Sequence, residues 1–149
     1  KNPVWEWLQT RGRGAHFPKQ IERADTRGVM RALKRGEVIW YAADQDYGRK
    51  HSVFAPFFGV QAASITGTAR FAKLNGSPVL LMSHFRDLDS GRYELCFSEP
   101  VQDYPSGDDV ADATTINALI ESEVRRHPSQ YLWVHRRFKT RPEGKADFY

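Results

Sequence analysis

The chain has 149 residues, 40% of them hydrophobic and 13% aromatic, which is enough for one domain of ordinary size with a buried core. Its single cysteine, Cys96, excludes a disulfide framework and a cysteine-based zinc site, and no apolar run approaches the ~18 residues of a membrane span. The net charge of +4 is unevenly distributed, since residues 86–123 hold ten acids and two bases between two basic segments, 11–35 and 124–149. Basic segments suit phosphates, membrane surfaces or nucleic acid, and a solvated surface accounts for them equally well.

The first predicted elements are a helix and a strand. Residues 25–35 predict a short helix, because Asp25 can cap its start and Gly36 suits the turn after its end. The apolar run "EVIWYA", residues 37–42, has no polar alternation and predicts a strand buried on both faces.

A second helix and a hairpin are predicted next. Residues 60–75 read as a helix with many small side chains, closing before Gly76. Residues 77–85 form a continuous apolar run that predicts a strand, and the turn "DLDSGR" leads to an alternating partner, residues 93–98.

An acidic loop at 103–112 precedes a third predicted helix and a last predicted strand. The buried stripe of that helix is expected at Ile116, Leu119, Ile120 and Val124, with an end at His127-Pro128. Residues 130–138, "QYLWVHRRF", predict the last strand. This order predicts an α/β fold with helices on the faces of a sheet.

Two carboxylates, Asp44 and Asp46, stand where the strand at 37–42 is expected to end, a position at which α/β sheets bind ligands. Side chains two residues apart share a face if the strand continues. Such a pair can bind a metal, share a proton or hold an arginine, and the many bases nearby favour the arginine. A turn acid plus a helix cap is the structural alternative.

Arg13 lies between two glycines in "TRGRG", which leaves its guanidinium room to approach a carboxylate or phosphate in a forked geometry. Standing alone, the stretch would suggest a solvated loop arginine.

His84 and Asp89 match the spacing H-x-x-x-x-D of glycerolipid-type acyltransferases, in which histidine deprotonates an acceptor hydroxyl. We do not expect this pair to act, because His84 ends an apolar strand and Asp89 lies in the turn beyond it.

The basic tail "LWVHRRFKTRP" interleaves four bases with Phe138. Such a tail could bind lipid phosphates, or RNA or DNA, although no RNP-like, KH-like or helix-turn-helix pattern is present.

In four stretches, in order and spacing, the chain resembles the bacterial lipid A biosynthesis acyltransferases, the late lauroyl- and myristoyl-transferases: "GEVIWYAADQDYG", "SVFAPFFGV", "TGTARFAKLNGSPVLL" and "QYLWVHRRFKTRPEG". The resemblance implies the glycerolipid-acyltransferase type of α/β fold, a mixed sheet with helices on both faces. It also implies that residues 1–149 are a single domain, the C-terminal half of an acyltransferase domain. The family's His/Glu motif, its general base, and a hydrophobic membrane anchor would then precede this chain.

The implied function is transfer of a fatty acyl chain from acyl carrier protein to a hydroxyl of a phosphorylated lipid A precursor, in lipopolysaccharide biosynthesis. The implied place is the cytoplasmic face of the inner membrane of a Gram-negative bacterium, at the membrane surface, with no nucleic acid partner and no metal or organic cofactor. The fragment alone is expected to be inactive. The alternative is a non-catalytic basic module that binds anionic lipid or nucleic acid.

Two positions match family motifs implicated at the active site: Arg13 matches the arginine of "GR" and Asp44 the first acid of "DxDYG". Arg13 could hold the substrate phosphate or stabilise charge developing at the thioester, and Asp44 could orient that arginine or the acceptor hydroxyl. Asp46 is expected to shape the turn with Gly48 and to border the substrate. Further substrate contacts are expected at four basic residues of the tail: Arg136, Arg137, Lys139 and Arg141.

Overall fold

The computed structural model describes residues 2–17, 19–22 and 25–149. The chain divides into two compact units, Lys1–Ile39 and Trp40–Tyr149. The expectation that residues 1–149 act as one domain stays a prediction.

The first unit contains two helices. The helix α1, Pro3–Gly14, begins where the side chain of Asn2 accepts hydrogen bonds from backbone N–H groups of the first turn, and it buries none of its residues. The helix α2, Thr26–Lys34, begins at Asp25, whose side chain caps the first turn, and Gly36 follows its end with a φ of 76°. The predicted helix, its cap and its final turn are confirmed.

The predicted strand at 37–42 is wrong, because no strand is assigned there and none of the described strands pairs with it. Val38 is 98% exposed, so an apolar run did not lead to burial. An extended apolar segment becomes a strand only when a neighbour supplies hydrogen-bonding partners, which local sequence cannot specify.

The second unit is built on an antiparallel hairpin of β1, Ser52–Phe57, and β2, Val60–Ile65. Its two-residue turn has a positive φ at both Phe58 (50°) and Gly59 (74°), as the twist of such a hairpin requires. The second half of β2 is buried. The prediction of one helix over 60–75 is therefore wrong for its first third, where small residues fit between packed layers of the core rather than on a helix.

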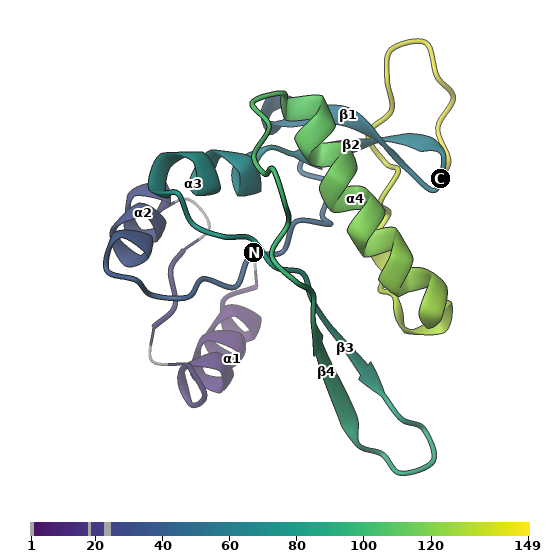
Figure 1. The fold of residues 1–149 in the computed structure, drawn as a ribbon. Helices are drawn as coiled ribbons and strands as arrows, with labels where there is room; N and C mark the ends of the chain where they lie inside the picture. Colours follow the sequence, from purple (N-terminus) through teal and green to yellow (C-terminus); the bar gives the residue numbers. More distant parts are fainter. Residues whose placement is uncertain (1, 18, 23–24) are drawn as a thin grey trace. The chain divides into compact units, whose positions relative to one another are not determined.

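Two helices accompany this hairpin (Figure 1). The helix α3, Gly67–Asn75, ends at Gly76 with a φ of 64°, as predicted. The helix α4, Asp109–Arg126, lies across β1 and ends at His127, also as predicted.

The buried face of α4 differs from the predicted apolar stripe. Val124 is buried as expected, whereas the three other predicted members, Ile116, Leu119 and Ile120, are half-buried. Asn117 occupies the centre of the face and is only 1% exposed.

A second hairpin pairs β3, Met82–Arg86, with β4, Tyr93–Phe97, and projects away from α4 and β1 in Figure 1. The predicted turn and alternating partner strand are confirmed. The predicted strand at 77–85 is confirmed only from Met82 onward.

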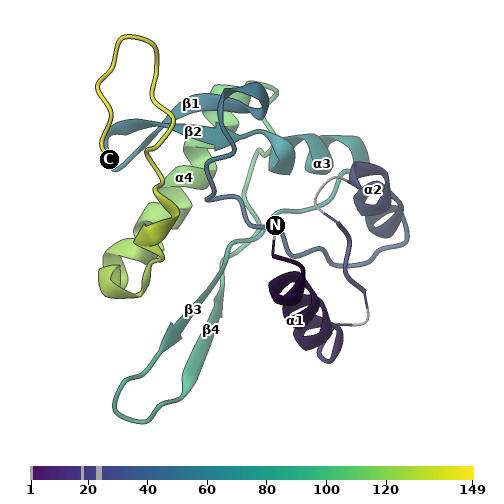
Figure 2. The ribbon, with the colours of Figure 1, turned by 180° about the vertical axis from the view of Figure 1, so that it is seen from behind.

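The C-terminal segment is irregular. Two short 3-10 turns, Pro128–Gln130 and Trp133–His135, are followed by Arg136 in the left-handed region with a φ of 48°. The strand predicted at 130–138 is wrong. In Figure 2 this segment passes beside β1 and β2. Its Arg137 side chain is buried and bonds to β2.

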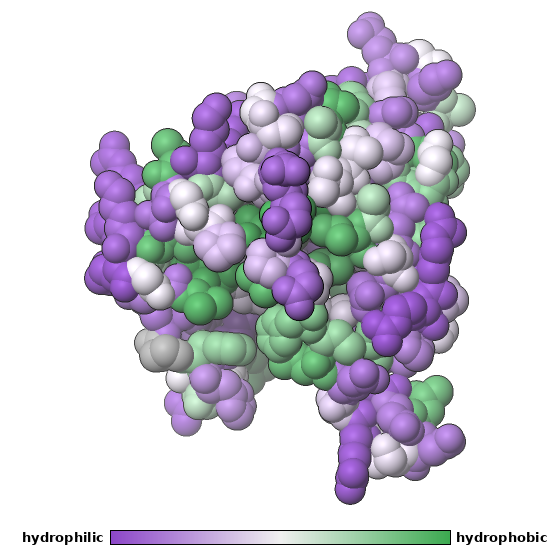
Figure 3. All heavy atoms as spheres, in the orientation of Figure 1, coloured by the Kyte–Doolittle hydropathy of each residue, from purple (hydrophilic) through white to green (hydrophobic). Residues whose placement is uncertain are grey.

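The expected α/β class is confirmed, with four α-helices and two small antiparallel sheets among the described residues. The core of the second unit is formed by alanines and Phe57 of the first hairpin with Ala113 and Val124 of α4. Hydrophobic side chains also remain visible among hydrophilic ones on the face drawn in Figure 3.

Candidate functional site

The loop of Asp44 and Asp46 is shaped by the second of these acids. Asp46 is 5% exposed, and its Oδ1 accepts a hydrogen bond from Gly48 N at 2.9 Å. Gly48 has a φ of 80°, a backbone conformation that is strained for any residue with a side chain larger than a hydrogen atom. The expectation that Asp46 and Gly48 shape the turn is confirmed.

Asp46 also joins this loop to the C-terminal segment, 94 residues later in the chain. Its Oδ2 accepts a hydrogen bond from Thr140 N at 2.8 Å, and its Oδ1 accepts another from Thr140 Oγ1 at 2.8 Å. The carboxylate thus receives three hydrogen bonds within the protein. They compensate its burial and leave little of it for a substrate.

Arg137 is the most deeply buried charged side chain among the described residues, with 1% exposure. Its Nη1 donates to Ala63 O at 2.7 Å, and its Nη2 donates to Ser64 Oγ at 2.8 Å and to Asn117 Oδ1 at 3.2 Å. Its guanidinium carbon lies 5.1 Å from the centre of the Phe57 ring. Arg137 therefore fastens the C-terminal segment to β2 and α4.

Asn117 completes this network from the helix side. Its Nδ2 donates to Pro56 O and to Ser64 Oγ, both at 2.9 Å. Ser64 Oγ in turn donates to Ala62 O at 3.1 Å. The side-chain amide of Asn117 and the hydroxyl of Ser64 are thus paired, as burial requires, whereas Arg137 Nε is buried without a hydrogen-bond partner.

The charge of Arg137 lies among neutral hydrogen-bond acceptors. Burial lowers the pKa of Arg137, and Tyr131, Asp46 and Asp44 act in the opposite direction. Because arginine stays protonated in proteins, the core holds a buried cation whose charge the two acids of the loop favour.

Asp44 is the more accessible of the two acids, since it is half-buried where Asp46 is enclosed. Burial, followed by the charge of Asp44, raises the pKa of the Tyr131 phenol, whose buried hydroxyl has no hydrogen-bond partner of ordinary geometry in the described structure. Asp44 therefore faces the cluster on one side and keeps exposed surface that a ligand can reach.

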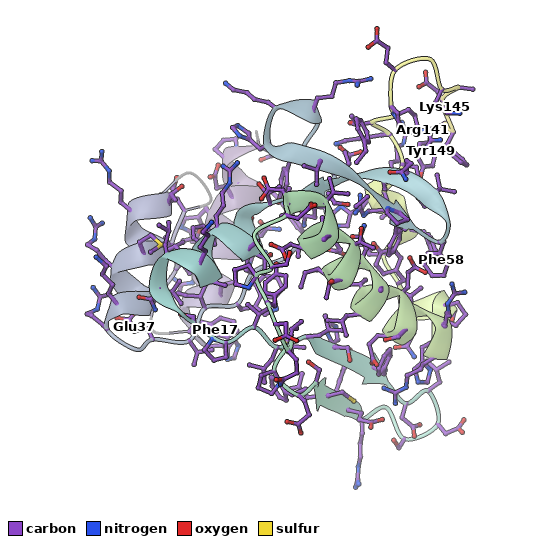
Figure 4. The ribbon with its side chains drawn as sticks, turned by 45° about the horizontal axis from the view of Figure 1, so that its top comes forward. Phe17, Glu37, Phe58, Arg141, Lys145 and Tyr149 are labelled. Atoms are coloured by element: carbon purple, nitrogen blue, oxygen red, sulfur yellow. The ribbon has the colours of Figure 1, made fainter. Side chains whose placement is uncertain are left out.

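The other basic residues of the tail lie at or near the surface. Two of them, Arg136 and Arg141, contact aromatic rings, and Arg141 also donates to a backbone carbonyl group. Arg136 is exposed and lies over the Tyr149 ring at 5.6 Å. Arg141 Nη1 donates to Gln61 O at 2.7 Å, and its guanidinium carbon is 4.5 Å from the centre of the Phe148 ring. In Figure 4, Arg141, Lys145 and Tyr149 lie together on the C-terminal segment.

An open hollow of about 370 Å³ lies beside Arg141 in the same unit. Among the residues that line it are four bases and two acids: Arg49, Lys139, Arg141, Lys145, Glu143 and Asp147. Lys139 is exposed, whereas Arg49 Nη2 donates to Arg141 O at 2.6 Å. The hollow can accept an anionic group, with the two lysines as its most available cations.

Arg13 belongs to the first unit, and the pair that we did not expect to act, His84 and Asp89, belongs to the second hairpin and its turn. Arg13 is exposed on the last turn of α1, in the first unit. His84 is exposed on β3 and Asp89 lies in the following turn, and no hydrogen bond or ion pair joins them in the described structure.

Neither a metal cluster nor a membrane span is found in the described parts of the chain. No group of three or more histidine, cysteine or acidic side chains there could hold a metal ion, and no helix is long and apolar enough to cross a bilayer.

Sequence reasoning missed three residues of the network: Asn117, Tyr131 and Thr140. Asn117 carried a detectable signal, because a polar residue at the centre of an apolar helix face needs a buried partner. Thr140 carried none, since a threonine between basic residues suggests only an exposed tail.

Comparison with known proteins identifies the family. The model of the bacterial lipid A biosynthesis acyltransferases matches residues 1–140. Similar proteins include the lipid A biosynthesis palmitoleoyltransferase of Escherichia coli K12, at 45% identity over 99% of this chain and 48% of its own length. The lipid A biosynthesis lauroyltransferase of the same organism is 42% identical over 99% of this chain and 49% of its own length. A lipid A biosynthesis acyltransferase of Haemophilus influenzae is 40% identical over 97% of this chain and 47% of its own length. The chain spans about half the length of these relatives, and it belongs to the bacterial lipid A biosynthesis acyltransferase family.

Proposed function

We propose that the protein is an acyltransferase of lipopolysaccharide biosynthesis, which moves a fatty acyl chain from acyl carrier protein to a hydroxyl of a phosphorylated lipid A precursor. The observation that carries the proposal is the family match over residues 1–140, supported by relatives named as palmitoleoyl- and lauroyltransferases. The donor, the acceptor and the activity of the whole protein belong to the proposal.

In the proposed reaction the acceptor oxygen attacks the thioester carbonyl, a C–O bond forms and the C–S bond breaks. The hydroxyl proton passes to a general base, and the released thiolate takes up a proton. We assign the base to a His/Glu motif in sequence that precedes residue 1, and the described residues give His84 no such role.

Arg13 and Asp44 are the two residues of this chain that we place at the reacting groups. Arg13 can hold a substrate phosphate or the charge that develops on the thioester oxygen, because an exposed guanidinium offers forked donors. Asp44 can accept a hydrogen bond from the acceptor hydroxyl or orient the arginine. Its half-buried place beside the Tyr131 hydroxyl supports a carboxylate held in a fixed position.

The basic tail divides into two proposed roles. Lys139, Arg136 and Arg141 border the surface and are proposed to contact phosphates of the substrate or acidic groups of the carrier protein. Arg137 and Asp46 are enclosed, so we propose that they support the site from behind rather than contact substrate.

We further propose that the protein works at the cytoplasmic face of the bacterial inner membrane, without a metal or organic cofactor. An acceptor with fatty acyl chains resides in a membrane, which is why a membrane surface belongs to the proposal.

The test uses the full-length enzyme in detergent with acyl carrier protein loaded with acyl chains of several lengths and a phosphorylated, acylated disaccharide. Mass spectrometry should show the acceptor gaining the mass of one acyl chain. Arg13→Ala and Asp44→Ala should each lower turnover about 10²-fold or more, at unchanged expression. The matched controls Arg27→Ala and Asp89→Ala, both at exposed positions, should leave turnover within about twofold.

An acceptor mass that does not change under any donor would contradict the proposal. In that case salt-sensitive binding to RNA or to anionic vesicles would favour the basic binding module instead.

A further inference from the structure

The loop that carries Asp44 is bonded to the C-terminal segment through a neighbouring side chain, Asp46. Within the loop, the bond from Gly48 N to Asp46 Oδ1 closes a local turn. Two further bonds, from Thr140 to Asp46, reach across 94 residues to another part of the chain.

Thr140 is itself held on both sides, which makes it a firm anchor. Three residues before it, Arg137 donates to Ala63 O of β2 and to Asn117 of α4. One residue after it, Arg141 donates to Gln61 O of β2 at 2.7 Å. The backbone at Thr140 is therefore tied to the first hairpin from both directions.

We propose that Thr140 is a positioning residue, which acts through Asp46 to hold the Asp44 carboxylate in its working place. The proposal rests on the proposed function for its effect on turnover, and on the hydrogen bonds alone for its effect on the loop.

Removing the Thr140 hydroxyl takes from Asp46 one of its three hydrogen bonds while the carboxylate stays buried. The loop then gains freedom to move away from the hairpin, and Asp44, two residues earlier, moves with it. A misplacement of about 1 Å at a reacting group lowers a rate by about 10²-fold.

The test compares three variants of the full-length enzyme. Thr140→Val keeps the shape and the backbone bond but loses the hydroxyl, and Thr140→Ser restores a hydroxyl. Thr115→Val is the matched control, because the exposed Thr115 donates only to Ala111 O of its own helix.

For Thr140→Val we expect a kcat about 10- to 100-fold lower, a KM within about twofold of wild type, and faster hydrogen exchange in residues 44–48. Thr140→Ser should recover most of the kcat and the slow exchange, and Thr115→Val should match wild type in both. A Thr140→Val enzyme with wild-type kcat and wild-type exchange would overturn the proposal. So would a folded Thr140→Ser enzyme as impaired as Thr140→Val.

Hydrogen exchange separates this proposal from the proposed function. If the wild-type protein transfers no acyl chain, the proposed function is wrong. Hydrogen exchange in residues 44–48 still tests whether Thr140 holds the loop. Faster exchange in Thr140→Val, restored in Thr140→Ser, then supports the anchor, and unchanged exchange overturns it.

Discussion

Replacing Arg137 with methionine tests whether this arginine is an internal support. Methionine has a similar length and no charge, so Arg137→Met removes the bonds to Ala63 O, Ser64 Oγ and Asn117 Oδ1 with little change of volume. Ser64 Oγ keeps its bonds to Asn117 and Ala62, which limits the loss there. Leaving a buried acceptor without its donor costs about 1–3 kcal/mol. Arg137→Met does this to Ala63 O and Asn117 Oδ1, so we expect a loss of about 2–4 kcal/mol.

Equilibrium urea unfolding, followed by tryptophan fluorescence and circular dichroism, measures this loss as a change in the free energy of unfolding. The control is Arg125→Met on α4, where the guanidinium is 63% exposed and pairs with Glu121 at 3.1 Å. An ion pair whose arginine is exposed in this way contributes about 0–1 kcal/mol. The reasoning is refuted if Arg137→Met costs no more than Arg125→Met.

Two further predictions concern the same cluster. Gly48→Ala should destabilise the protein by about 1–3 kcal/mol, because Gly48 has a φ of 80° and a ψ of −177°, a conformation restricted to glycine; a loss below about 0.5 kcal/mol in urea unfolding would contradict the turn described here. Burial, and then the charge of nearby acids, raises the pKa values of Tyr131 and Tyr104 in the folded protein. Above pH ~10 these phenols lose their protons in the unfolded state while the folded state still holds them. The free energy of unfolding therefore falls as the pH rises. Tyr131→Phe should therefore lose less Tm than wild type between about pH 9 and 11, and a constant difference in Tm across that range would refute the assignment.

Local signals in the sequence predicted the elements whose ends are set locally. Asp25 caps α2, and the turn "DLDSGR" closes the second hairpin through Asp87, whose Oδ1 accepts hydrogen bonds from two backbone N–H groups. His127-Pro128 ends α4 because the residue before proline is disfavoured in a helix. These signals act over a few residues and need no tertiary partner.

The wrong predictions concern segments whose structure depends on contacts with residues far away in the sequence. Residues 130–138 look like a strand, but the left-handed Arg136 turns the chain so that Arg137 points into the core. The alanines of β2 look helical, but they fit beneath Asn117 and Arg137, whose amide and guanidinium groups bond to β2.

The sequence singles out the candidate residues, and it does not reveal the hydrogen bonds that connect them. Asp44 and the basic tail stand out in the sequence, and Asp46 was correctly given the turn at Gly48. That Thr140 bonds Asp46 across 94 residues follows from no pattern along the chain. Which bases face inward, as Arg137 does, likewise depends on how the tail packs against the hairpin.

The most direct test of the proposed function is the acyl-chain content of lipid A in cells of a Gram-negative host that lacks the gene for this protein. Mass spectra should show one added acyl chain when the full-length wild-type protein is expressed, and none when Asp44→Ala is expressed at the same level. Equal acylation by the two proteins would contradict the central claim that the Asp44 loop forms part of an acyl-transfer site.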